Sequence, residues 1–133
     1  MRSLLSLVFA VMLTALLGGC DASAEEAIYC LAVAEPGIVL FVEDAETAAN
    51  LAPIATARIQ DGDYVETLRG ALFDAPGGDP LHLKGAEDRA GVYTLTVDAE
   101  GYRPFVLSNV EVRDNACSVT TVNITARLEP IAS

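Results

Sequence analysis

The feature that most constrains the fold is the stretch Gly91–Tyr102, in which apolar and polar side chains alternate from Tyr93 to Glu100. Tyr93, Leu95 and Val97 are separated by threonines. Because successive side chains of a strand point to opposite faces, this pattern predicts a half-buried strand with its apolar set facing a core. Glycine at position 101 breaks the strand, and the tyrosine after it is expected to turn the corner.

Neighbouring segments predict further short strands. Ile38–Val42 is an unbroken apolar run, which predicts a strand buried on both faces. Residues 55–60 alternate, and Asp61-Gly62 predicts a tight turn because glycine accepts a positive φ angle. Residues 64–68 then return as the second strand of a hairpin, and residues 81–83 predict a short edge strand.

The C-terminal third continues the pattern. The apolar phase of residues 104–112 changes at Ser108-Asn109, which predicts a bulge that keeps both halves facing the core. Residues 117–128 predict the last strand, with every second side chain apolar from Val122 to Leu128. No stretch after residue 20 has a sustained helical period. Six or seven short strands with regular turns therefore predict one antiparallel β-sandwich domain over residues 28–133.

The first twenty residues have the character of a targeting segment. Leu4–Leu17 is almost wholly apolar but too short to span a bilayer comfortably. The small residues before Cys20 resemble the bacterial lipobox. This resemblance implies a lipoprotein signal peptide over residues 1–19, a diacylglycerol thioether on Cys20 and palmitate-type acylation of the new N-terminus, with residues 20–27 as lipidated cysteine and short tether. The alternative is an ordinary secretory signal cleaved near Ala22 or Ala24.

An anchor at Cys20 predicts a periplasm-facing protein of the bacterial cell envelope, whose membrane contact is the lipid. Asp21 resembles the inner-membrane retention signal of some proteobacteria, but that rule depends on the organism, so inner and outer membranes both stay open. Removal of residues 1–19 leaves seven basic and nineteen acidic residues, a net charge of −12. Such a surface repels nucleic acid and anionic headgroups, which argues against nucleic-acid partners.

Two further cysteines, Cys30 and Cys117, lie near the two ends of the domain. In an oxidising envelope compartment, two remaining cysteines are expected to form a disulfide. Free buried thiols are the alternative. The spacing of the two residues excludes a zinc knuckle and a redox Cys-x-x-Cys motif.

The strand over residues 91–97, followed by Gly101-Tyr102, resembles the core signature of carboxypeptidase regulatory-like domains. Other segments that resemble the family are residues 39–44, 53–55, 57–59, 61–62 and 110–112, Cys117 and residues 121–128. The resemblance implies a transthyretin-like (prealbumin-like) sandwich of about seven strands with Greek-key connections, and it brings no catalytic residues. The chain departs from the family at Asn50–Pro53, where Gly-x-Pro is usual, and in the proline- and glycine-rich connection 69–90.

Catalytic and metal-binding patterns are weak in this chain. His82 is the only histidine, and no serine lies in a nucleophile elbow, so we expect no enzyme activity and no cofactor. Oxygen ligands for Ca²⁺ occur at Glu43-Asp44-Glu46, Asp61-Asp63 and Glu87-Asp88. None of these clusters has the spacing of an EF-hand, so we interpret them as turn-forming acids and expect no metal site.

The leading functional hypothesis is a lipid-anchored, non-enzymatic structural or protein-interaction module whose partner is an envelope protein or polymer. Loops, above all residues 69–90, would carry recognition. The alternative is a carbohydrate or small-ligand binding module that uses Tyr64, Phe73 and Tyr102. Packing at a corner or in the core is the competing role for each of these three aromatic residues.

Overall fold

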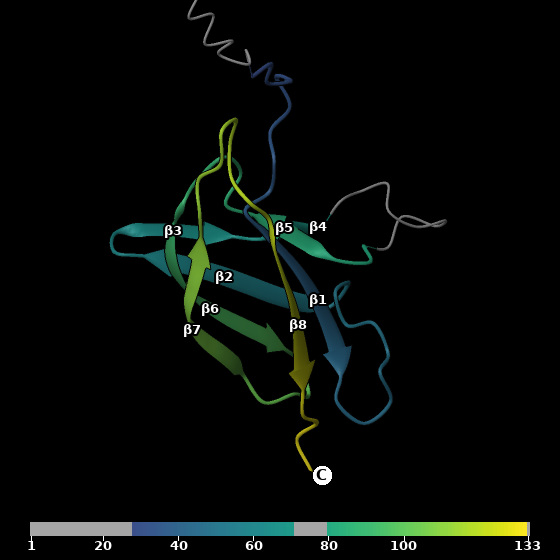
Figure 1. Cartoon of the computed structure of the whole chain (residues 1–133). Helices are drawn as coiled ribbons and strands as arrows, with labels where there is room; N and C mark the ends of the chain where they lie inside the picture. The colour runs from purple at the N-terminus through teal and green to yellow at the C-terminus, as the bar shows by residue number, and fades with distance from the viewer. Residues whose placement is uncertain (1–27, 71–79, 133) are drawn as a thin grey trace, which may run out of the picture.

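The computed structural model describes residues 28–70 and 80–132, and this part of the chain forms eight β-strands and no helix (Figure 1). The all-β prediction is confirmed, with one strand more than the sequence suggested. The strands are β1 (Ile38–Asp44), β2 (Ala55–Asp61), β3 (Tyr64–Thr67), β4 (Arg69–Gly70), β5 (Leu83–Gly85), β6 (Gly91–Ala99), β7 (Phe105–Val112) and β8 (Val122–Leu128).

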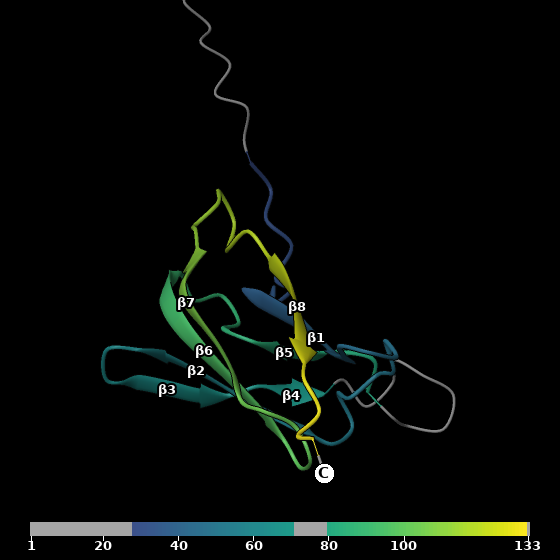
Figure 2. The ribbon, with the colours of Figure 1, turned by 90° about the horizontal axis from the view of Figure 1, so that it is seen from below.

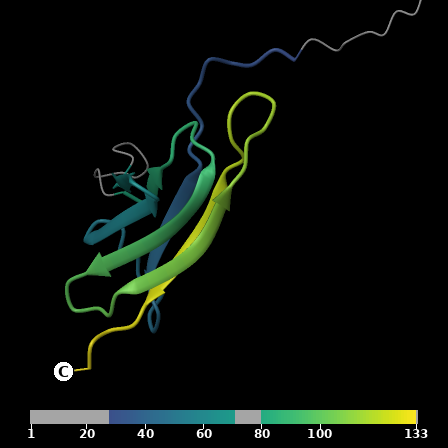
Figure 3. The ribbon, with the colours of Figure 1, turned by 90° about the vertical axis from the view of Figure 1, so that its left-hand side faces the viewer.

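The strands form two four-stranded sheets, with the orders β4-β5-β1-β8 and β3-β2-β6-β7, that lie as two layers (Figure 3). All pairings are antiparallel except β1 with β8, which run parallel from Ile38 opposite Val122 to Asp44 opposite Leu128. The expectation of a wholly antiparallel fold is wrong at this pair. Side-chain alternation reports which face is buried but not the direction of the neighbouring strand, and a parallel pair needs a long crossover between its strands.

The core lies between the two layers and confirms the predicted orientation of β6. Tyr93, Leu95 and Val97 are fully buried, and threonines fill the positions between them. Strand β6 is an interior strand, with β2 and β7 on its two sides. The largest fully buried side chains come from both sheets: Tyr93, Ile38, Leu40, Ile59, Leu95, Leu128, Val42 and Val97.

Strand β1 corrects a second expectation. Ile38, Leu40 and Val42 are fully buried, but Val39 is only partly buried and Phe41 is 37% exposed. The run is therefore buried on one face, not on both. No third layer covers the outer face of this sheet within the described residues, so the apolar side chains there remain in contact with solvent.

Two local predictions are confirmed at the predicted residues. Strands β2 and β3 form a hairpin in which Asp61 pairs with Tyr64, and Gly62 in the two-residue loop has a φ of 58°. In the β6–β7 pair the register shifts so that Thr94 lies opposite both Ser108 and Asn109, and Asn109 has a φ of 59°. This bulge returns Val110 to the core, as the change of apolar phase requires.

Two predicted strands differ from the structure in their bounds or in their place in the sheet. Residues 81–83 were expected to form an edge strand, but β5 begins at Leu83 and lies inside its sheet, between β4 and β1. The last strand begins at Val122 and not at Cys117, because the preceding residues form a loop closed by a bridge between Asp114 and Val119.

The two ends of the described chain leave the domain at opposite ends. Residues 28–34 have no regular strand and run beside the loop between β7 and β8, whereas the chain after β8 emerges at the far end (Figures 1 and 2). The segment before β1 is therefore an extended lead-in and not a strand.

Replacement of Leu95 by alanine tests the core. We expect Leu95→Ala to lower the free energy of unfolding by about 2–5 kcal/mol, because it removes a fully buried side chain. The matched control is Val92→Ala on the outer face of the same strand, where the side chain is 51% exposed, and it should cost about 1 kcal/mol or less. Urea unfolding of the soluble chain from Asp21 measures both, and equal losses would contradict this orientation of β6.

Candidate functional site

Tyr64, one of the three aromatic residues considered for ligand binding, is held in a cluster at one end of the two layers. Its hydroxyl donates to Oε2 of Glu66 at 2.7 Å, and this bond, together with burial, raises the pKa of Tyr64 to about 12. The guanidinium of Arg89 lies 3.8 Å from the centre of the ring. The ring of Tyr93 meets it edge-on at a centroid distance of 6.4 Å. These contacts give the Tyr64 ring a structural role.

Arg89 joins this cluster to two neighbouring strands, β2 and β6. Its Nη1 donates to Oδ2 of Asp61 at 3.1 Å and to the hydroxyl of Tyr93 at 2.9 Å. The Tyr93 hydroxyl in turn donates to the main-chain carbonyl of Arg89 at 2.8 Å. The polar ends of buried side chains are satisfied in this way at the entrance to the core.

Tyr102 forms a second polar link at the opposite end of β6. Its hydroxyl donates to Oδ2 of Asp44 at 2.7 Å and so connects the end of β6 with the end of β1 in the other sheet. The other oxygen of Asp44, which is 8% exposed, accepts main-chain N–H groups of Glu46 and Thr47. The bond from Tyr102, helped by these two, lowers the pKa of Asp44. A glycine with a φ of 85°, Gly101, allows the turn that places the tyrosine.

The two candidate aromatic residues that the structure describes, Tyr64 and Tyr102, do not share one surface. Tyr64 lies beside Tyr93 at the beginning of β6, and Tyr102 follows its end. At about 3.3 Å per residue, roughly 20 Å of strand separates these two positions. Phe73 lies outside the described residues, as does Cys20.

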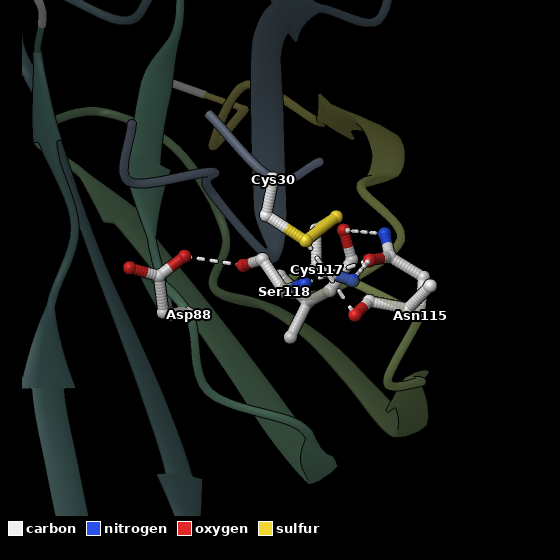
Figure 4. The surroundings of a disulfide bond; sticks show 7 residues. Cys30, Asp88, Asn115, Cys117 and Ser118 are labelled. Atoms are coloured by element: carbon white, nitrogen blue, oxygen red, sulfur yellow. Dashed lines mark hydrogen bonds between the residues drawn. A yellow bond between two sulfur atoms is a disulfide. The ribbon is translucent and has the colours of Figure 1, made fainter. Parts of the chain in front are cut away.

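Cys30 and Cys117 form a disulfide, with a Cα–Cα distance of 5.3 Å, in agreement with the predicted pairing (Figure 4). The bond joins the lead-in segment to the β7–β8 loop. Oδ1 of Asn115 shapes this loop by accepting the main-chain N–H groups of Cys117 and Ser118. The hydroxyl of Ser118 donates to the carboxylate of Asp88, which links the loop to the segment before β6.

The acidic clusters considered for Ca²⁺ supply local hydrogen bonds in the structure. Asp44 caps its own turn, Asp61 accepts from Arg89, and Asp88 accepts from Ser118 and from the main-chain N–H of Glu35. The bond from Ser118, followed by the bond from Glu35, lowers the pKa of Asp88. Across residues 28–70 and 80–132, no three His, Cys, Asp or Glu side chains come together as a metal site.

A cleft of about 780 Å³ opens between β3 and the β4–β5 pair. Strands β3 and β4 are edge strands of the two sheets, so the cleft lies where the layers separate. Arg69 and Lys84 line it and are direct cross-strand partners, and Tyr64, Glu66 and Glu87 line it as well. Sequence reasoning missed the two cations, because their pairing depends on a two-residue strand that carries no periodic signal.

His82, the single histidine, is half-buried on the outer side of the sheet that contains β1. Its ring lies 5.5 Å from that of Phe41, centre to centre. In the part of the chain that the structure describes, no helix has the length and apolar character needed to cross a membrane.

No family model matches the chain, and no curated protein matches it. The resemblance to carboxypeptidase regulatory-like domains therefore rests on the sequence motifs and stays a prediction.

The Tyr102–Asp44 bond gives a pH-dependent prediction. Tyr102→Phe removes only the hydroxyl that donates to Asp44, so we expect lower stability to urea at pH 7. Because the pKa of Asp44 is lowered from 3.8 on folding, its stabilisation is present above that value and is lost as the pH falls through the lower folded value. The difference between wild type and variant should therefore shrink below about pH 4.

Tyr29→Phe is the matched control for this substitution, because the Tyr29 side chain is 91% exposed. It should leave the urea midpoint unchanged at both pH values. If Tyr102→Phe lost the same stability at neutral and at acid pH, the hydroxyl of Tyr102 would not be what lowers the pKa of Asp44.

Proposed function

We propose that this protein is a lipid-anchored, non-enzymatic domain of the bacterial envelope that acts as a protein-interaction module. The motif before Cys20 supports the anchor. Two layers of mostly antiparallel strands, together with the motif over residues 91–102, support a Greek-key sandwich related to carboxypeptidase regulatory-like domains. Since such a fold hosts many functions, the recognition chemistry has to come from a site.

The observation that carries the proposal is the pair of cations in the cleft beside β3. Arg69 and Lys84 lie directly opposite each other, and like charges in that position destabilise a sheet. Within the described residues neither forms an ion pair with an acid. Without residues 1–19 the chain has a net charge of −12, and Glu66 and Glu87 line the same cleft, so the positive charge is confined to this pair. A carboxylate supplied by a partner would relieve the repulsion between the two cations.

An extended acidic segment of an envelope protein fits this cleft best. Strand β3 is an edge strand, so its outer main-chain groups can pair with an added strand, while the cations bind carboxylates. A sugar would need an open aromatic face, and the Tyr64 ring has Arg89 stacked on it. The same cleft contains residues from both ends of the 69–90 connection, the region from which the sequence predicts recognition.

Charge reversal in the cleft tests the partner site. We expect the double variant Arg69→Glu/Lys84→Glu of the soluble chain from Asp21 to capture its envelope partner about tenfold or more weakly, because two exposed ion pairs become repulsive contacts. Arg58→Glu, on the outer face of β2, is the matched control and should retain capture. Equal capture by both variants would remove the cleft from the proposal, and turnover of a substrate by the soluble chain would remove its non-enzymatic character.

The anchor is tested separately. Cells that express the full chain should incorporate labelled palmitate into it, and Cys20→Ala should abolish the label because it removes the acceptor sulfur. Cys30→Ala is the matched control and should keep the label. Labelling that persists in Cys20→Ala would contradict the lipoprotein assignment.

A further inference from the structure

The lead-in segment Ile28–Ala34 exposes its apolar side chains to solvent. Ile28, Tyr29, Leu31 and Val33 are 68%, 91%, 85% and 62% exposed. No charged residue occurs in the segment. A contiguous, uncharged apolar stretch of this kind marks a contact surface more often than chance exposure of single side chains does.

The segment is fastened to the domain and is not a free tail. The Cys30–Cys117 disulfide holds its middle against the β7–β8 loop (Figure 4). At its C-terminal end, Glu35 and Asp88 exchange two hydrogen bonds of 3.0 Å, one from each main-chain N–H. Any surface that covers the apolar side chains therefore also fixes the orientation of the whole domain.

The length of chain before the segment indicates what covers it. Eight residues lead from Cys20 to Ile28, and at full extension they reach about 26–29 Å. If Cys20 carries lipid, as the proposed function holds, the segment lies within this distance of the bilayer surface.

We propose that Ile28–Ala34 is an interfacial element that lies in the headgroup region of the bilayer that holds the Cys20 lipid. Tyrosine suits this region because its ring is apolar and its hydroxyl is hydrated, and aliphatic side chains can be buried at the boundary with the acyl chains. The lack of charge in the segment avoids the repulsion that the acidic remainder of the domain has for anionic lipid. The inference rests on the proposed lipid anchor and adds to it a fixed orientation, with the Tyr102 end directed away from the membrane.

The chain has no tryptophan, which allows a single fluorescent reporter. Tyr29→Trp in the full lipidated protein places it on the segment, and Ile131→Trp, where the side chain is 57% exposed, places the matched reporter at the opposite end of the domain. Each protein is reconstituted into phosphatidylcholine–phosphatidylethanolamine vesicles that contain brominated phosphatidylcholine, and flotation of the vesicles is measured on the same samples.

We expect position 29 to lose roughly half of its tryptophan emission to the bromines, since interfacial side chains lie about 5–10 Å into the boundary, and position 131 to be unaffected. Adding Leu31→Asp to the reporter protein should reduce the quenching, whereas Leu81→Asp, at a 49% exposed position elsewhere, should not. Both added substitutions are at exposed positions, so the fold is expected to be retained.

The outcomes separate the two levels of the proposal. Protein that floats with the vesicles but shows no quenching at position 29 overturns the interfacial role and leaves the anchor intact. A second contrary result is no quenching in pure lipid together with a blue shift of the emission that occurs only in native envelope membranes. This result assigns the segment to a protein partner and also overturns the interfacial role. Protein that does not float contradicts the anchor and the interfacial role together.

Discussion

The structure depends on two interior strands, one in each sheet, whose apolar side chains are buried between the two layers. Strand β1 contributes Ile38, Leu40 and Val42, and β6 contributes three further fully buried side chains. Each such side chain stabilises the fold by about 1.5–3 kcal/mol relative to exposure. Because both strands have neighbours on both sides, every other strand must present its own apolar face to the same space, and this requirement sets the register of β2, β7 and β8.

Burial alone does not close the two ends of the layers, where main-chain and side-chain polar groups meet solvent. Polar links do so at both ends, and in each case a tyrosine from the β6 region provides the hydroxyl. At one end Tyr93 bonds with Arg89, and at the other Tyr102 donates to Asp44. Of these residues, Tyr102 and Asp44, which the sequence offered as a binding aromatic and a calcium ligand, link the two sheets.

Properties that depend on local side-chain period were predictable from the sequence. The orientation of β6, the turn at Gly62 and the bulge at Asn109 follow from alternation and from residues that tolerate positive φ. The parallel β1–β8 pair, the interior position of β5 and the cation pair of the cleft were not predictable, because each depends on which distant segments become neighbours. For the same reason, Tyr64 and Tyr102 could be named as candidates but not recognised as lying at opposite ends.

The disulfide shows how a covalent bond can contribute more to placement than to packing. A closed loop with a separation of 87 residues stabilises a fold by about 4–5 kcal/mol when only the unfolded state is considered. Cys30, however, lies on a segment whose large side chains remain exposed, so the bond also restricts native chain that gains little from burial. The net stabilisation should therefore be smaller than the loop length implies. The bond determines where the N-terminal part of the chain leaves the domain, which is at the end opposite the C-terminus (Figure 1). If the domain is anchored through Cys20, as proposed, that point decides which loops face away from the membrane.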